Sequence, residues 1–134
     1  RPFEYVASAL RQLNAQTDAG PPLLHHLAAM GQPLFQWPTP DGYPDDIDFW
    51  TGSLFARWRF ALALANGKIP GTKVDLPALL EKTNGSTPAG QLQQFAVLLL
   101  GQPLPASVTG PLLKSERKKV VLAALLGSPA FQWR

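Results

Sequence analysis

The sequence predicts an all-α fold: an irregular bundle of six or seven helices around a central apolar helix at about residues 51–66. Segments of helical character repeatedly begin at Ser, Thr or Asp followed by proline and end at glycine, as α-helices often do. No segment shows the sustained alternation of apolar and polar residues that indicates a half-buried strand. Between Leu54 and Ala65 only Arg57 and Arg59 are polar, and a helix that is apolar nearly all round normally lies inside a bundle, surrounded by other helices.

The other helices follow from local start and stop signals, and together they form one helical domain over residues 1–134. Two precede the central helix, at Pro2–Leu13 and from Pro21 or Pro22 to a C-terminal cap at Gly31. After the central helix we expect a short helix at Leu76–Lys82 with Asp75 as N-cap, and then a helix from Thr87-Pro88 to Leu100 closed by Gly101. A short turn or helix lies within Ala106–Leu113. The last elements are a helix from Ser115-Glu116 to Leu126 and a terminal turn from Ser128-Pro129.

A long loop rich in proline and aromatic residues, the aromatic loop (residues 31–50), precedes the central helix. Its prolines exclude a helix or a central strand, and long irregular loops in small domains are usually functional or disordered. It carries too much apolar surface for a solvated linker, so we expect it to be ordered and packed across the helices. The residues concerned are Pro33, Pro38, Pro40 and Pro44, with Leu34, Phe35, Trp37, Tyr43, Phe49 and Trp50.

The two arginines of the central helix predict a tie between that helix and the loop. The helix is expected to begin between Asp48 and Thr51 and to end at Asn66-Gly67. Arg57 and Arg59 lie about 200° apart around the helix axis, so at least one must reach past apolar neighbours to a partner. We expect a buried or half-buried pair between an arginine and a loop aspartate.

The loop also holds the one dense group of carboxylates, at Asp41, Asp45, Asp46 and Asp48. Carboxylates before a helix cap its N-terminus and pair with arginine, which is the preferred interpretation. A site for a hard cation such as Ca²⁺ is an alternative, although the spacing D-x-x-x-D-D-x-D does not match an EF-hand loop. Paired-carboxylate catalysis is a further alternative that needs a cleft. We expect no cofactor beyond this Ca²⁺ alternative.

Four loop residues, Trp37, Asp41, Tyr43 and Trp50, are candidates for a recognition surface. Exposed aromatic rings would suit a sugar or a peptide, whereas aromatic residues at this density more often form a core. His25 and His26 are adjacent on a predicted helix, point about 100° apart and so do not form an i, i+4 metal pair. A structural role is preferred for them, with participation in a site beside the loop as an alternative.

Composition excludes several classes of protein. The chain has no cysteine, so disulfides and thiol catalysis are excluded. The longest apolar stretches, Phe95–Leu100 and Val120–Leu126, are too short for a transmembrane helix. The net charge of +3 is mild, and the basic group Lys114, Arg117, Lys118 and Lys119 is more typical of a solvated helix face than of a nucleic-acid interface. We expect no nucleic acid as partner and no transmembrane segment in this chain.

A resemblance to a known family appears in specific strings. GQPLFQWPTPDGYPDD, followed by tryptophan and an R-x-R-F-A-L helix, and the ending VVLAALLGSPAFQWR resemble the C-terminal part of the bacterial "domain of unknown function 1800" family. The opening RPFEYVASALRQLNA, the TDAG turn and the Pro-Leu-Leu helix are similar to the segment that precedes the loop there. Pro38, Asp41, Gly42, Pro44 and Trp50 match the family motif, which implies a shared structural or binding role and no catalytic residue.

Members of that family are longer and typically carry export signals, and they are often encoded beside a sulfatase-like secreted family. The resemblance therefore implies a C-terminal fragment of a periplasmic or extracellular protein, in agreement with a chain that begins at Arg1 without methionine. The first hypothesis for function is a helical structural or interaction module whose contact surface is the segment Gln36–Trp50. The alternative is part of an exported enzyme that acts on polysaccharide or cell-envelope material. Expected partners are the N-terminal portion of the same protein and a protein or a polysaccharide.

Overall fold

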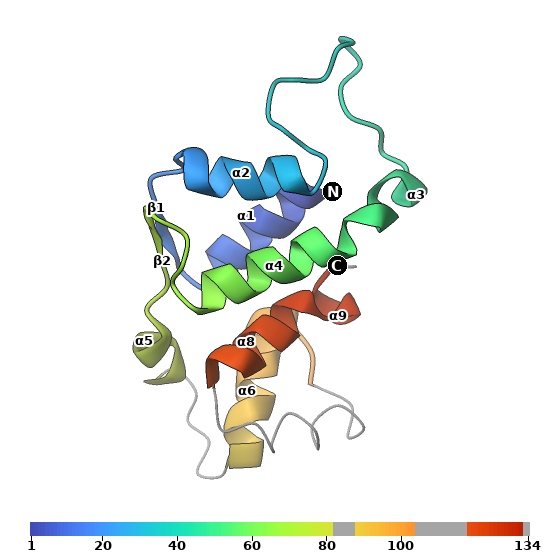
Figure 1. The fold of residues 1–134 in the computed structure, drawn as a ribbon. Coiled ribbons are helices and arrows are strands. Elements are labelled where there is room, and N and C mark those ends of the chain that lie inside the picture. The colour runs from blue at the N-terminus through green and yellow to red at the C-terminus, as the bar shows by residue number, and fades with distance from the viewer. Residues whose placement is uncertain (82–87, 104–117, 133–134) are drawn as a thin grey trace.

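The all-α prediction is confirmed by the computed structural model, which describes residues 1–81, 88–103 and 118–132 and is mostly helical (Figure 1). A small two-stranded sheet accompanies the helices. The elements are α1 (Pro2–Gln12), β1 (Gln16–Thr17), α2 (Pro21–Ala29), α3 (Ile47–Trp50), the 3₁₀ turn η1 (Thr51–Ser53), α4 (Leu54–Ala65), β2 (Thr72–Lys73), α5 (Leu76–Glu81), α6 (Pro88–Leu100), α8 (Lys118–Gly127) and α9 (Pro129–Gln132).

Most helix ends lie where local signals predict them. Gly31, Gly67 and Gly101 follow α2, α4 and α6 with φ of 91°, 65° and 73°, the left-handed conformation that glycine adopts most easily. The Asp75 carboxylate accepts a hydrogen bond from the Ala78 amide at 3.1 Å and so caps α5. The predicted starts at Thr87 and Ser115-Glu116 and the segment Ala106–Leu113 lie outside the described residues.

The central helix begins later than predicted. Two short pieces, α3 and η1, precede α4, so the helical run over residues 47–65 is not one continuous α-helix. The Thr51 hydroxyl donates to the Asp48 carbonyl at 2.9 Å and the Ser53 hydroxyl donates to the Trp50 carbonyl at 2.8 Å. These side chains occupy carbonyls that a continuous helix would use, and Gly52 between them is a weak helix former.

The strand pair was not predicted. Gln16 lies opposite Lys73 and Thr17 opposite Thr72 in antiparallel register, and the two threonine hydroxyls are 2.7 Å apart. Two residues per strand are too few to show an alternating pattern in the sequence. The pair joins the segment after α1 to the segment after α4, which are distant in the chain (Figure 1).

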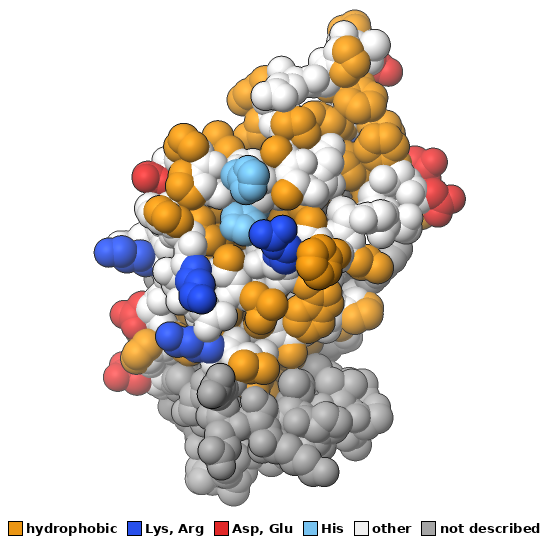
Figure 2. Space-filling view, viewed as in Figure 1, with side chains coloured by type: hydrophobic (Ala, Val, Ile, Leu, Met, Phe, Trp, Pro, Cys, Tyr) orange, Lys and Arg blue, Asp and Glu red, His pale blue; other side chains and the backbone are white. Residues whose placement is uncertain are grey.

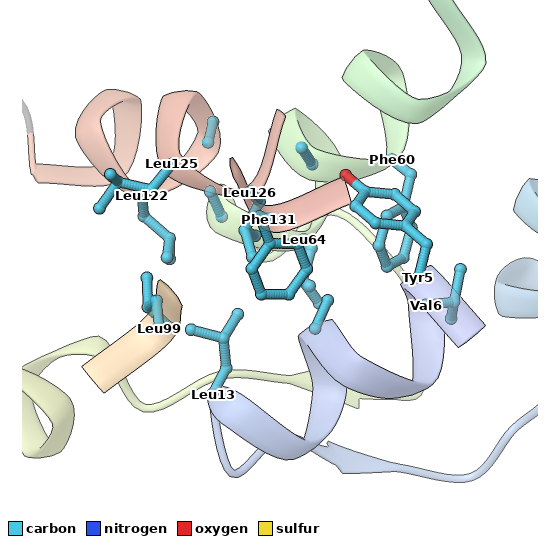
Figure 3. Close-up of a cluster of buried hydrophobic side chains, with 14 of the residues drawn as sticks. Tyr5, Val6, Leu13, Phe60, Leu64, Leu99, Leu122, Leu125, Leu126 and Phe131 are labelled. Carbon is cyan, nitrogen blue, oxygen red and sulfur yellow. The ribbon is translucent and has the colours of Figure 1, made fainter. Parts of the chain in front are cut away.

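The core lies between α4 and α8, which pack more extensively on each other than any other two elements among the described residues. Figure 3 shows side chains from α1, α4, α6, α8 and α9 meeting in one cluster. The labelled members are Tyr5, Val6, Leu13, Phe60, Leu64, Leu99, Leu122, Leu125, Leu126 and Phe131, all buried. The position of α4 agrees with the prediction of a central helix.

One side of α4 differs from that prediction, because the described helices cover it only in part. Leu54, Phe55, Trp58 and Leu62 are exposed, with Phe55 exposed to 75 %. Their spacing places them along one side of the helix. None of the described helices is long and apolar enough to cross a membrane.

Substitution Leu126→Ala should lower the free energy of unfolding by about 2–5 kcal/mol, because Leu126 is fully buried on α8 and its loss leaves a cavity. Urea denaturation followed by circular dichroism measures the change. Val120→Ala is the matched control on the same helix, since Val120 is exposed and should change stability by no more than about 0.5 kcal/mol. Equal effects of the two substitutions would contradict the assigned core.

Candidate binding site at the base of the aromatic loop

The aromatic loop leaves the end of α2, projects away from the bundle and returns at α3 (Figure 1). Leu34, near the start of the loop, packs against the core cluster, but the expectation that the aromatic residues of the loop pack across the helices is wrong. Its prolines remove backbone donors that could bind the helices, and its aromatic rings pack on one another instead of on the bundle. Phe35 is fully exposed, at 101 %, and has a φ of 61°, which is uncommon for an aromatic residue.

Four rings form an aromatic cluster, defined as Trp37, Tyr43, Phe49 and Trp50. Ring centroids are 4.7 Å apart for Trp37 and Tyr43 and 4.7 Å for Phe49 and Trp50. The Trp50 indole donates to the Pro44 carbonyl at 3.0 Å, and the Tyr43 hydroxyl donates to the Pro33 carbonyl. The cluster thus acts as a small core that holds the two arms of the loop together.

The predicted recognition residues are divided between interior and surface. Trp50 is buried, with 7 % exposed, whereas Trp37 and Tyr43 are partly buried. The indole N–H of Trp37 is buried without a hydrogen-bond partner among the described residues. Asp41 is exposed and accepts a hydrogen bond from the Thr39 hydroxyl. The three predicted recognition rings therefore do not form a flat platform that is exposed to solvent, because Trp50 is buried and the other two are partly buried.

The carboxylates of the loop bind different partners and do not act as one group. Asp46 caps α3 by accepting from the Asp48 amide at 3.0 Å, and Asp45 pairs with Arg1 through Nε at 3.2 Å. Within residues 1–81, 88–103 and 118–132 no group of three or more His, Cys, Asp or Glu side chains is placed to hold a metal ion. The described carboxylate interactions of this acidic stretch are helix capping by Asp46, the ion pair of Asp45 with Arg1 and the hydrogen bond that Asp41 accepts from Thr39.

The pair expected between a central-helix arginine and a loop aspartate is not found among the described residues. Arg57 is buried, with 6 % exposed, and its Nε donates to the Ser53 hydroxyl at 3.0 Å. Its guanidinium carbon lies 5.2 Å from the centre of the Tyr5 ring. Arg59 is exposed, and the ion pair that joins loop to bundle is made by Arg1. Ser53 takes the place of the aspartate because it lies one helical turn before Arg57.

A cavity of about 480 Å³ lies at the base of the loop, where α3 meets the N-terminal ends of α1 and α4 and the short α9. Its charged lining residues are Arg1, Glu4, Asp45, Asp46 and Arg57. Burial lowers the pKa of Arg57 from its ordinary value, and the interaction with Tyr5 opposes this shift. The cavity was not predicted, because it joins residues 1–4, 45–57 and 129–132, which share no motif and meet only in the fold.

The two histidines lie outside this cavity lining, so the alternative of a shared site with the loop gains no support from the cavity. Figure 2 shows them together on one face of the molecule, with a basic side chain next to them. His26 is half-buried and its ring contacts Phe60 edge-on, with centroids 5.7 Å apart. Burial lowers the pKa of His26, and the nearby charges of His25 and Arg59 lower it further.

The basic group predicted near the C-terminal end is only partly visible. Lys114 and Arg117 lie outside the described residues, as does the side chain of Lys118, while Lys119 is exposed. These residues therefore add no described surface to the site.

The chain matches the model of a known protein family. The model of a family described as "Protein of unknown function (DUF1800)" matches residues 1–133. No curated protein and no solved structure matches the chain.

Substitution Trp50→Ala should lower the free energy of unfolding by about 3–5 kcal/mol and should speed cleavage of the loop by a protease, because Trp50 anchors the aromatic cluster. Urea denaturation and limited proteolysis measure the two effects. Phe35→Ala is the control from the same loop and should leave stability nearly unchanged, since the ring is fully exposed. Cleavage of the Trp50→Ala loop that is no faster than cleavage of the unsubstituted loop would contradict the anchoring role of Trp50.

The lowered pKa of His26 predicts a loss of stability in acid. An unfolded histidine takes up a proton near pH 6.5, whereas folded His26 does so only at lower pH. Below pH 6.5 the unfolded state therefore binds more protons, and the free energy of unfolding falls as the pH falls through this window. The melting temperature between about pH 8 and about pH 5 reports this loss.

Substitution His26→Gln should flatten that part of the pH profile. His25→Gln should keep most of the pH dependence of stability, because burial is the largest cause of the lowered His26 pKa and the charge of His25 is a smaller cause. An unchanged slope in His26→Gln would assign the pH dependence to another group.

Proposed function

The chain belongs to the family "Protein of unknown function (DUF1800)", and on that premise we propose that it is a helical interaction module of an exported bacterial protein, with the aromatic loop as its contact surface. The contact surface extends from Phe35 to Trp50, one residue more than the segment selected from the sequence. Its setting is the periplasm or the exterior of the cell, as the resemblance of the sequence implies. The partner is another protein, or the N-terminal portion of a longer chain.

The observation that supports this proposal most strongly is the exposure of apolar side chains on an ordered, projecting loop. Phe35 is fully exposed, and Ile47 and Phe49 are exposed by about half. Exposed apolar surface of this kind is typical of binding sites. Because the aromatic cluster already holds the loop in shape, little conformational entropy would be lost when a partner binds.

The chemistry of the loop also favours a protein partner. Large aromatic side chains are the usual anchors of protein interfaces, where they fill a pocket in the partner. Phe35 is free to fill such a pocket, whereas most rings of the cluster are engaged with one another. The unpaired indole N–H of Trp37 is a second irregularity in the same loop, and irregularities of this kind in native structures often have a functional origin.

A second candidate function is a part of an exported enzyme that acts on polysaccharide or cell-envelope material. The cavity at the base of the loop supports it, because Glu4, Asp45 and Asp46 contribute carboxylates to one concave site. Asp45 is paired with the Arg1 side chain, Asp46 caps α3, and Glu4 pairs with the N-terminal ammonium of Arg1 at 3.5 Å. Glu4 is the candidate acid or base, because an exposed ion pair of this length holds its carboxylate only weakly. This candidate is the weaker of the two because all three of its carboxylates already serve other interactions.

Photo-crosslinking in the bacterial cell tests whether the aromatic loop contacts a partner. With a benzophenone amino acid at position 35 of the intact protein, we expect one discrete cross-linked product, because the ring at this position is presented to the partner. The same group at position 97 is the control, since Val97 is exposed on α6, outside the aromatic loop. Once the partner is purified, Phe35→Ala should weaken its binding about tenfold or more.

Equal cross-linking from positions 35 and 97, or none from 35, would contradict the contact role of the loop. Thermal-shift measurements with oligosaccharides address the second candidate. A rise in melting temperature that Glu4→Gln abolishes, with folding intact, would favour the enzyme.

A further inference from the structure

We propose that the cavity at the base of the loop binds a carboxylate group through Arg57, in a small molecule or chain end whose remaining part is neutral or positively charged. An amino acid or the C-terminal end of a short peptide has this chemistry. The inference concerns the cavity, so it does not depend on which partner binds the aromatic loop.

The first step is the state of the Arg57 guanidinium. It is almost fully buried, it belongs to the cavity lining, and no carboxylate forms an ion pair with it among the described residues. Its Nε–H donates to the Ser53 hydroxyl. The structure gives the terminal N–H groups no hydrogen-bond acceptor within residues 1–81, 88–103 and 118–132, although a guanidinium carries donors on all three nitrogens.

The second step is energetic. A buried cation without a counter-ion is unfavourable, and burial accordingly lowers the pKa of Arg57. An anion that enters the cavity would restore the missing interaction in surroundings that screen it less than water does. The planar guanidinium matches a carboxylate through two parallel N–H···O bonds, which makes this pair one of the stronger hydrogen-bonded pairs in proteins.

The third step is preorganisation. Ser53 holds the Nε of Arg57 and in turn donates to the Trp50 carbonyl at 2.8 Å, so the side chain is linked to the backbone of the preceding turn. The guanidinium also lies over the Tyr5 ring, with its carbon 5.2 Å from the ring centre. An arginine held in this way loses little side-chain entropy when it binds a ligand.

The fourth step is the selection among anions. Glu4, Asp45 and Asp46 line the same cavity, and of these Asp45 is paired with the Arg1 side chain at 3.2 Å and Glu4 with the N-terminal ammonium of Arg1 at 3.5 Å, which leaves Asp46 without a cationic partner among the described residues. The remaining negative charge disfavours phosphate and other multiply charged anions. A single carboxylate that carries an ammonium group or neutral amides satisfies Arg57 and also suits the acidic lining. The volume of about 480 Å³ lies in the range of small-molecule sites.

Nuclear magnetic resonance on the ¹⁵N-labelled chain tests the proposal directly. Sodium acetate, glycylglycine and inorganic phosphate are added separately at constant ionic strength, and the Nε–H signals of the arginines are followed. We expect a saturable shift of the Arg57 signal with acetate and glycylglycine, with tighter binding of glycylglycine and weaker binding of phosphate. The Arg59 signal, from an exposed side chain on the same helix, should show no saturation.

Two substitutions sharpen the test. Arg57→Gln should weaken binding of glycylglycine about tenfold or more, because it removes a charged donor, whereas Arg59→Gln should leave it unchanged. Arg57→Lys should retain part of the affinity, since it keeps the charge and loses the two-pronged geometry. If Arg57→Gln fails to fold, the titration of the Arg57 Nε–H signal in the unsubstituted chain still tests the proposal.

Three results would overturn the proposal. They are an Arg57 signal that does not saturate with either carboxylate, phosphate binding tighter than carboxylate binding, and an Arg57→Gln variant that binds glycylglycine as tightly as the original chain.

Discussion

The packing of α4 on α8 is the interaction on which the rest of the structure depends. Phe60 and Leu64 of α4 lie in one cluster with Leu122 and Leu126 of α8, and all four are fully or almost fully buried (Figure 3). The two helices also approach closely at one end, where a Cβ on Gly127 would lie 3.1 Å from the Trp58 indole. Because only the short turn η1 separates the aromatic loop from α4, this contact also influences the position of the loop and of the cavity at its base.

Tyr5 connects this core to the cavity. Its ring contacts Phe60 and Phe131 edge-on, with centroids 5.6 and 5.9 Å away, and Arg57 lies over it. Its hydroxyl donates to the Arg57 carbonyl at 3.4 Å, and burial raises its pKa well above the ordinary value. Tyr5 therefore stays neutral and supports the buried cation through its ring. Tyr5 is therefore one route by which a change in the packing of α1 or α9 would reach Arg57.

The aromatic loop is stabilised in a different way from the bundle. The ring contacts of its aromatic cluster are internal, as in the contact of Trp37 with Tyr43, and the Trp50 indole donates to the Pro44 carbonyl within the loop. The loop is tied to the bundle by the ion pair of Asp45 with Arg1 and by the hydrogen bond from the Phe3 amide to the Gln32 side chain at 2.8 Å. Such a loop keeps its shape without covering the helices, which leaves both its own apolar side chains and the outer side of α4 exposed. These surfaces and the cavity are separate features, so a partner on the loop and a ligand in the cavity are compatible.

The sequence by itself determined the helical class, the centre of the bundle and most helix ends, because these depend on residues within a few positions of one another. Glycines such as Gly31 and Gly67 end helices through their own backbone freedom, and Asp75 caps the helix that follows it. Only the tertiary structure decided the direction of the loop, the pairing of β1 with β2 and the cavity. The partner of Arg57 shows the physical reason: an aspartate and a serine both satisfy a guanidinium donor, and the choice depends on distances that only the folded chain defines.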